Sequence, residues 1–202
     1  MKSFAIIPAA GTSSRMGRPK LLLPWRGRTM IEQTIAAWQA GGVSAVIVVV
    51  QPGDSALKKV VLQTGAVTVL PPVAPPEMKV SVQFGLAYVA QEFNPRGIDV
   101  WLLAPADMPQ LSPRIVARLL ANHDFTAANI LIPTLAGGRG HPVLFPWPLA
   151  EEVKHLGPNE GLNALIARHG GRELPCDDLE PLDDAFADID TPDEYRRGQS
   201  PK

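Results

Sequence analysis

The chain has 202 residues, of which 46% are hydrophobic and 19% charged, and its formal net charge is −1. This length and composition predict a single globular domain covering residues 1–202. The chain has no apolar run of roughly 18 residues and no interleaving of basic with aromatic residues, so we expect neither a membrane span nor nucleic-acid binding. The single cysteine, Cys176, excludes an intrachain disulfide, and a cytoplasmic location is the default expectation.

Short apolar runs alternate with segments of helical spacing along the chain. Thr29 and Glu32 have the spacing of a capping box, and Ser112 followed by Pro113 is typical of a helix start. Strands are predicted at residues 3–7, 45–50, 67–70, 99–104, 130–132 and 143–145, and helices at 29–40, 55–63, 79–91, 112–122, 161–169 and 192–197. This alternation predicts a three-layer α/β/α sandwich with a mostly parallel sheet, in which ligands bind beyond the carboxyl ends of the strands.

Charge is distributed unevenly along the sequence. Residues 1–31 contain basic but no acidic side chains, whereas residues 177–195 contain acidic but no basic ones. A basic segment favours an anionic ligand. The acidic segment is either a solvated surface or a source of metal ligands. The proline-rich stretch at residues 71–76 is either a surface connector or one wall of a substrate cleft.

The loop after the first strand, residues 8–20, combines small residues, glycines and basic side chains. Successive backbone N–H groups near Ala10 and Gly11 can form an anion-binding nest, and Arg15 and Lys20 add positive charge suited to phosphate. Five residues separate Gly11 from the next glycine, which excludes the spacing of a Walker P-loop. From the residues alone, the loop either binds phosphate or is a solvated basic turn.

Acidic residues follow the strand predicted at residues 99–104 and recur near the end of the chain. Asp107 is either a turn residue or a ligand of Mg²⁺, which needs few carboxylates because it keeps water and phosphate oxygens. In an extended segment, Asp188 and Asp190 would lie on the same side with Ile189 facing inward. We therefore expect the second metal ligand among these two, with Asp188 favoured and Asp190 as support or as a further ligand.

Residues 9–24, AAGTSSRMGRPKLLLP, closely resemble the signature of the MobA-like nucleotidyltransferases, nearest to the molybdenum cofactor cytidylyltransferase branch. The resemblance implies a Rossmann-like fold of the nucleotide-diphospho-sugar transferase type. It implies catalytic roles for Arg15, Lys20 and Asp107, and Mg²⁺ bound by Asp107 in the Asp-Met-Pro motif and by the closing Asp-Ile-Asp-Thr-Pro motif. The nucleotide-binding residues that it implies are Ala9, Ala10, Gly11, Thr12, Arg15, Lys20 and Ser81.

Three further segments match the family less closely. Ser81 either touches the nucleotide or hydrogen-bonds the first turn of its helix. His141, in a Gly-His-Pro-Val-Leu-Phe segment, either lines the acceptor site or has a structural role in a turn. Asn159 and Asn163 stand where family members of the molybdenum cofactor type carry an Asp and an Arg, which raises the question of a different acceptor.

These features predict a transferase that moves a nucleoside monophosphate from an NTP to a phosphorylated small molecule and releases pyrophosphate. The pair Ala10-Gly11 resembles the cytidylyl branch, which favours CTP over GTP and molybdopterin as the acceptor, with a contact to a molybdoenzyme as a further implication. The alternatives are a nucleotidyltransferase acting on a sugar or polyol phosphate, and a catalytically idle nucleotide-binding accessory protein of molybdoenzymes.

Overall fold

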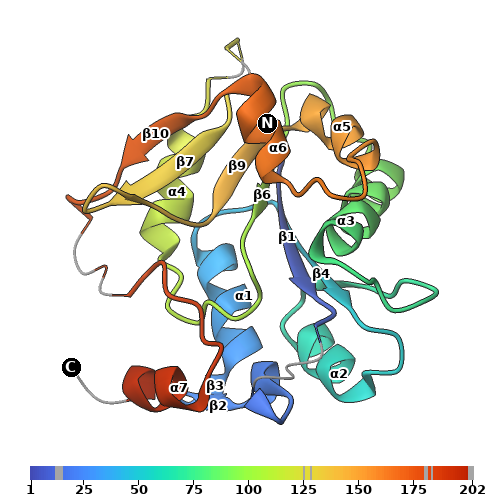
Figure 1. The fold of residues 1–202 in the computed structure, drawn as a ribbon, viewed down its shortest axis with the longest axis vertical. Coiled ribbons are helices and arrows are strands. Elements are labelled where there is room, and N and C mark those ends of the chain that lie inside the picture. Colours follow the sequence, from blue (N-terminus) through green and yellow to red (C-terminus); the bar gives the residue numbers. More distant parts are fainter. Residues whose placement is uncertain (12–15, 125, 128, 180–181, 183, 200–202) are drawn as a thin grey trace.

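The computed structural model describes residues 1–11, 16–124, 126–127, 129–179, 182 and 184–199. An eight-stranded sheet forms the middle layer (Figure 1), in the order β10-β7-β9-β6-β1-β4-β5 with β8 beside β7. Its strands are β1 (Ser3–Ala9), β4 (Ala45–Val50), β5 (Val67–Val69), β6 (Val100–Leu103), β7 (Leu131–Leu135), β8 (Gly138–Arg139), β9 (Val143–Pro146) and β10 (Arg172–Pro175).

The sheet is mostly parallel, as the sequence predicts. β4 and β6 pair in parallel with β1 on either side, and β5 pairs in parallel with β4. β9 is antiparallel to both β6 and β7, and β10 returns to the parallel direction beside β7. The carboxyl ends of β1, β4 and β6 therefore meet at one edge of the sheet.

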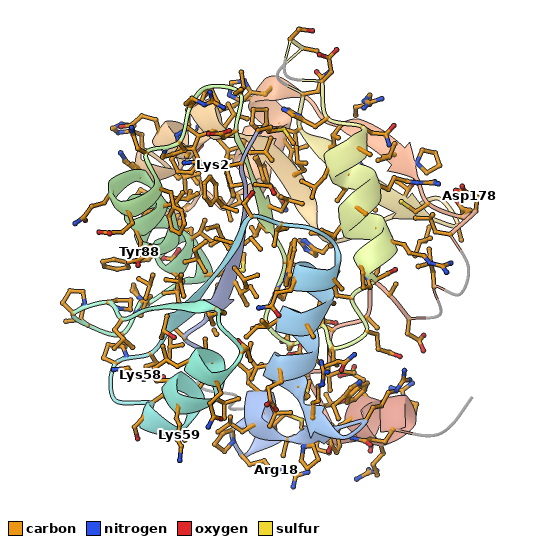
Figure 2. The ribbon with its side chains drawn as sticks, turned by 180° about the vertical axis from the view of Figure 1, so that it is seen from behind. Lys2, Arg18, Lys58, Lys59, Tyr88 and Asp178 are labelled. Atoms are coloured by element: carbon orange, nitrogen blue, oxygen red, sulfur yellow. The ribbon has the colours of Figure 1, made fainter. Side chains whose placement is uncertain are left out.

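Helices cover both faces of the sheet, which gives the predicted three layers. One face packs against α1 (Met30–Ala40), α2 (Ser55–Gln63) and α4 (Pro113–Ala121), which are in front in Figure 2. The other face packs against α3 (Met78–Phe93), α5 (Ala150–Lys154) and α6 (Asn163–His169). Successive residues of β1 alternate between the two cores, so that strand is buried on both sides and its sequence is continuously apolar.

Local sequence signals account for where several helices begin. The Thr29 hydroxyl accepts from the Glu32 backbone N–H at 3.3 Å, and the Glu32 carboxylate accepts from the Thr29 backbone N–H at 2.7 Å. This reciprocal pair is the predicted capping box of α1. Ser112 caps α4 by accepting from Arg114 N–H, and Pro113 occupies the first helical position.

The last helix, α7 (Pro192–Gln199), lies outside the three layers, beside the hairpin of β2 (Pro24–Trp25) and β3 (Arg28–Thr29) (Figure 1). Tyr195 donates from its hydroxyl to the Pro24 carbonyl at 2.5 Å, and its ring lies 5.9 Å from that of Trp25. A Cβ on Gly198 would lie 2.2 Å from the Trp25 ring, so only glycine fits at this contact. The chain near residue 195 is thus packed against the segment that follows the first loop.

Several elements were not predicted from the sequence. β10 and β8 are polar, α5 has five residues, and the two-residue strands β2 and β3 form a separate hairpin. None of these has a long apolar period, which is the signal used for the others. Among the described residues, no helix is long and apolar enough to cross a membrane.

Candidate active site

The side chain of Lys20 meets two carboxylates at the carboxyl edge of the sheet. Its Nζ donates to Asp107 Oδ2 and, at 2.7 Å, to Asp190 Oδ1. Lys20 opens the short helix η2 (Lys20–Leu22), Asp107 follows β6, and Asp190 precedes α7. The fold therefore brings together side chains that are up to 170 residues apart in the sequence.

Burial and pairing act against each other at this centre. Burial raises the pKa of Asp107 above its ordinary value, and the hydrogen bond from Lys20 opposes this only in part. Burial also opposes the charge on Lys20, but the hydrogen bonds to Asp107 and Asp190 outweigh it and raise the pKa of Lys20. The lysine is therefore held as the cation, while the ionised form of Asp107 is held at a free-energy cost.

Backbone contacts fix the two carboxylates relative to each other. The Ile189 N–H donates to the Asp107 carbonyl at 3.0 Å, and the Ile189 side chain is buried beside Trp25 and Met30. On the other side, the Thr34 hydroxyl donates to the carbonyl of Ala106 at 3.2 Å. The residues flanking Asp107 are thus held from both α1 and the segment before α7.

A second capping box holds the backbone of Asp190. The Glu194 carboxylate accepts from the N–H groups of Asp190 and Thr191, both at 2.8 Å, and the Glu194 N–H donates to the Thr191 hydroxyl. The sequence predicted a helix opened by Thr191 but not the part played by Glu194. Its position three residues after Thr191 was the signal that could have revealed it.

The two candidate carboxylates near residue 190 do not occupy equivalent positions. Asp190 contacts Lys20, whereas Asp188 is exposed and lines a separate pocket of about 380 Å³ with Gln110 and Arg197. The preference for Asp188 as the second ligand stays a prediction, and the contact with Lys20 places Asp190 in the centre beside Asp107.

His141 lies near the same carboxylates. Its Nδ1 is 3.4 Å from the Leu103 carbonyl, and burial lowers its pKa, while Asp188 and Asp107 act in the opposite direction. The preceding Gly140 packs so closely on the Phe186 ring that a Cβ would lie 2.1 Å from it. Burial therefore favours the neutral imidazole of His141, which lies beside the end of β6.

One buried oxygen suggests where a cation would fit. Asp107 Oδ1 has no hydrogen-bond partner among the described residues, although its carboxylate is 15% exposed. An unmatched buried acceptor is unfavourable unless a donor or cation reaches it. The described part of the chain holds no cluster of three or more His, Cys, Asp or Glu residues suited to a metal. The donor set thus fits an ion that takes one or two carboxylates and completes its shell with phosphate and water, as Mg²⁺ does.

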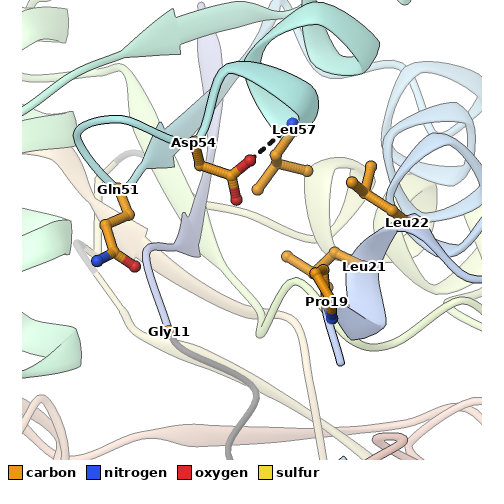
Figure 3. Close-up of a pocket in the computed structure, with 7 residues that line it drawn as sticks. All are labelled: Gly11, Pro19, Leu21, Leu22, Gln51, Asp54 and Leu57. Atoms are coloured by element: carbon orange, nitrogen blue, oxygen red, sulfur yellow. Dashed lines mark hydrogen bonds between the residues drawn. The ribbon is translucent and has the colours of Figure 1, made fainter. Parts of the chain in front are cut away.

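A pocket opens where β1 and β4 end (Figure 3). It has a volume of about 270 Å³. Asp54 caps α2 by accepting from the Leu57 N–H at 2.9 Å, the contact drawn as a dashed line. Gly11 is one of the lining residues, and a Cβ there would touch nothing within 4 Å. The lining residues are Gly11, Pro19, Leu21, Leu22, Gln51, Asp54 and Leu57.

The structure places two of the other predicted residues, Ala9 and Ala10, at the same edge. Ala9 ends β1 and Ala10 follows it, before the pocket. Ser81 is buried in the first turns of α3, at 3% exposure. Thr12 and Arg15 lie outside the described residues. Gln51 and Asp54 line the pocket without having been predicted as site residues.

The parallel sheet, the small-residue loop after β1 and the lysine–carboxylate centre beyond β6 define an α/β nucleotidyltransferase fold. A model of the MobA-like NTP transferase domain matches residues 5–173. The chain belongs to this family and is a nucleotidyltransferase.

The named relatives include both a nucleotidyltransferase and an oxidoreductase. The chain is 28% identical to a molybdenum cofactor guanylyltransferase of Rhizobium meliloti (strain 1021), over 97% of this chain and 90% of that protein. It is 30% identical to nicotine blue oxidoreductase of Paenarthrobacter nicotinovorans, over 69% of this chain and 68% of that protein. The crystal structure of Rv0371c from Mycobacterium tuberculosis H37Rv is similar with a TM-score of 0.79 and 31% identity, covering 98% and 97% of the two chains. That protein has also been solved in complex with manganese.

Proposed function

We propose that the chain transfers a nucleoside monophosphate from an NTP to the phosphate of molybdopterin, with Mg²⁺ as cofactor and CTP as the favoured nucleotide. The observation that carries this proposal is the contact of Lys20 with Asp107 and Asp190 beside the loop that follows β1. A catalytically idle nucleotide-binding protein would have no need for two carboxylates held at this position. A sugar or polyol phosphate is the alternative acceptor.

The reaction is an in-line displacement at the α-phosphorus. An oxygen of the acceptor phosphate forms a new bond to the α-phosphorus. The bond between the α-phosphorus and the oxygen that bridges the α- and β-phosphates breaks, and pyrophosphate leaves. The acceptor phosphate is already ionised at neutral pH, so the site needs no strong general base, and catalysis depends on positioning and charge stabilisation. This agrees with a site whose residues are charged groups held by backbone contacts.

Each residue has a part in this scheme. Asp107 would hold the divalent cation together with Asp188 or Asp190, and the cation would supply charge stabilisation at the phosphates. Lys20, which contacts the carboxylates in the structure, would then turn its ammonium to the triphosphate. Backbone N–H groups at Ala10 and Gly11 would bind phosphate oxygens.

The choice of base is supported by the loop and the neighbouring pocket. Gln51 and Asp54 offer hydrogen-bond acceptors for an exocyclic amino group, which cytosine, guanine and adenine carry and uracil lacks, so they disfavour UTP. The preference for CTP comes from the pair Ala10-Gly11, which resembles the cytidylyl branch of the family more than the guanylyl branch. The name of the Rhizobium relative makes GTP the competing proposal.

The test is pyrophosphate release with CTP, GTP, ATP and UTP, each with and without molybdopterin and Mg²⁺. We expect release with CTP only when both molybdopterin and Mg²⁺ are present, and none from Asp107→Asn. Release with GTP alone would move the base assignment to guanine. Pyrophosphate release with sugar or polyol phosphates but not with molybdopterin would overturn the assignment of molybdopterin as the acceptor. No pyrophosphate release with any acceptor would favour a catalytically idle nucleotide-binding protein.

A further inference from the structure

The side chain of Lys79, in the first turn of α3, binds the connection between α5 and α6. Its Nζ donates to the carbonyls of Gly157 at 2.6 Å, Pro158 at 2.8 Å and Glu160 at 3.0 Å, and lies 3.3 Å from the Glu77 carboxylate. Lys79 is only 8% exposed. An ammonium has three N–H donors, so three carbonyls satisfy it fully, and a buried charge is tolerated only with such partners.

The turn at residues 157–160 is also closed on itself. The Glu160 carboxylate accepts from the Gly157 N–H at 2.7 Å, and the Glu160 N–H donates to the Gly157 carbonyl at 3.0 Å. The Arg168 guanidinium binds the other oxygen of the same carboxylate. Two cations, Lys79 and Arg168, therefore determine the shape of this turn.

The first turn of α3, with Lys79, lies toward the carboxyl edge of the sheet, because the last residue of α3 lies at the amino end of β1, where Lys2 Nζ donates to the Phe93 carbonyl at 2.8 Å. A Cβ on Gly85 would lie 3.0 Å from Ile6 and 3.3 Å from Val49, so α3 packs directly on β1 and β4, which border the pocket of Figure 3. The turn at 157–160 follows β9 and α5, in the part of the chain that begins with His141. The ammonium of Lys79 is thus a direct link between the helix that packs on β1 and β4 and the turn that follows α5.

The orientation of the turn suits an anionic ligand. Because three carbonyl oxygens point at Lys79, the negative ends of their peptide groups are turned inward and away from the surface. Asn159 and Asn163, on either side of Gly161, are exposed and offer amide N–H donors. A turn with its carbonyls withdrawn and amide donors exposed would attract, and not repel, an acceptor that carries phosphate.

We propose that Lys79 is a positioning residue for the acceptor: it holds the turn at 157–160, with Asn159 and Asn163, at a fixed distance from the nucleotide. The inference rests on the proposed function, because it presumes a phosphorylated acceptor. Lys79 acts through the turn and touches neither substrate. Its loss therefore affects the acceptor, since α3 itself stays fixed by its packing on β1 and β4.

The experiment measures pyrophosphate release while acceptor and CTP are titrated separately. Lys79→Met should raise KM for the acceptor about tenfold and leave KM for CTP within about twofold, since small displacements of positioning groups have large effects on reaction. The matched control is Lys59→Met, which removes an exposed lysine of α2 (Figure 2) and should change neither constant. Equal changes in both constants, or a loss of thermal stability with no change in either, would show a purely structural role.

Chemical rescue adds a readout that general destabilisation would not give. In Lys79→Ala the three carbonyls and the Glu77 carboxylate would form an empty cation cradle, so ethylammonium chloride should restore the acceptor KM, while choline chloride, which has no N–H donor, should not. Recovery with both salts or with neither would overturn the proposal.

A readout independent of activity distinguishes failure of the proposed transferase function from failure of the proposed role of Lys79. Peptide-resolved hydrogen exchange at residues 157–163 should be faster in Lys79→Ala and slow again in ethylammonium. If the wild type releases no pyrophosphate with any acceptor, the proposed function fails, while hydrogen exchange still tests whether Lys79 holds the turn. Unchanged exchange at the turn in Lys79→Ala would overturn the role of Lys79 even if the wild type is fully active.

Discussion

Asp107→Asn is expected to make the metal-free protein more stable while abolishing its activity. The substitution keeps the shape of the side chain and removes a charge whose ionisation is opposed by burial, as the raised pKa of Asp107 indicates. Lys20 keeps its hydrogen bond to Asp190 at 2.7 Å, so its ammonium does not become an unpaired buried charge. The variant thus removes the buried charge of Asp107 and keeps the hydrogen bond between Lys20 and Asp190.

The expected magnitude follows from two opposing contributions. A neutral acceptor weakens the hydrogen bond from Lys20 by about 1 kcal/mol, whereas desolvating a carboxylate costs several kcal/mol. Because burial prevails in the pKa of Asp107, we expect a net gain of about 1 kcal/mol at pH 7. For a chain of this size, this corresponds to a rise of about 2–4 °C in Tm.

The pH dependence gives the sign of the effect. A carboxyl group whose folded-state pKa is raised contributes stability below its unfolded pKa and loses it as the pH rises through the folded value. The difference between Asp107→Asn and the wild type should therefore be near zero at pH 3, below the ordinary value of 3.8, and grow toward neutral pH. Glu92→Gln, an exposed carboxylate of α3, is the matched control and should change little at either pH.

Thermal unfolding with and without a divalent cation is the assay. Mg²⁺ or Mn²⁺ at about 100 times its dissociation constant should stabilise the wild type by about 2.7 kcal/mol and the variant much less, so that the order of stability reverses. The reasoning is refuted if metal-free Asp107→Asn is less stable than the wild type at pH 7, or if the difference is the same at pH 3.

Two further substitutions test the same centre. Lys20→Met should lower the free energy of unfolding, measured in urea, by about 3 kcal/mol, because it removes the ammonium that both carboxylates contact. It should also slow pyrophosphate release on the order of 10²-fold or more. A decrease in this rate of less than about threefold would exclude Lys20 from catalysis. Gly198→Ala should cost about 1–3 kcal/mol and reduce activity, since the added methyl would overlap Trp25 and displace α7. Gly97→Ala, where nothing lies within 4 Å, is its control, and equal stability of the two variants would show that the contact with Trp25 is unimportant.

The central part of the fold could be predicted because its sequence signals are local and strong. The segment at 45–50 is a continuous apolar run, as a strand buried on both faces must be, and the observed β4 has the same bounds. The edge strand β10 could not be predicted in this way, because its residues Arg172–Pro175 are exposed or half-buried and lack alternation. Its place beside β7 is fixed by tertiary contact alone.

In the site, too, residues with a local sequence signal could be predicted, and residues positioned by tertiary contacts could not. Lys20 and Asp107 were predicted from the loop and from the end of a strand, and the structure brings them into contact. Strand periodicity placed Asp188 and Asp190 on one side, but Glu194 draws the backbone of Asp190 into a cap, and only Asp190 reaches Lys20. Lys79 gave no signal, because its partners are backbone carbonyls more than 70 residues away.

Lys20 and Asp190 are 170 residues apart in the sequence, so their contact forms only in a chain that has been synthesised as far as α7 and has not been cleaved. The family match ends at residue 173, before Asp188, Asp190 and α7. A ribosome that stopped near residue 180, or a protease that cut there, would leave a product that carries the matched domain and keeps Lys20 and Asp107 but lacks Asp190. On the proposed mechanism, such a fragment would still match the family and would release no pyrophosphate.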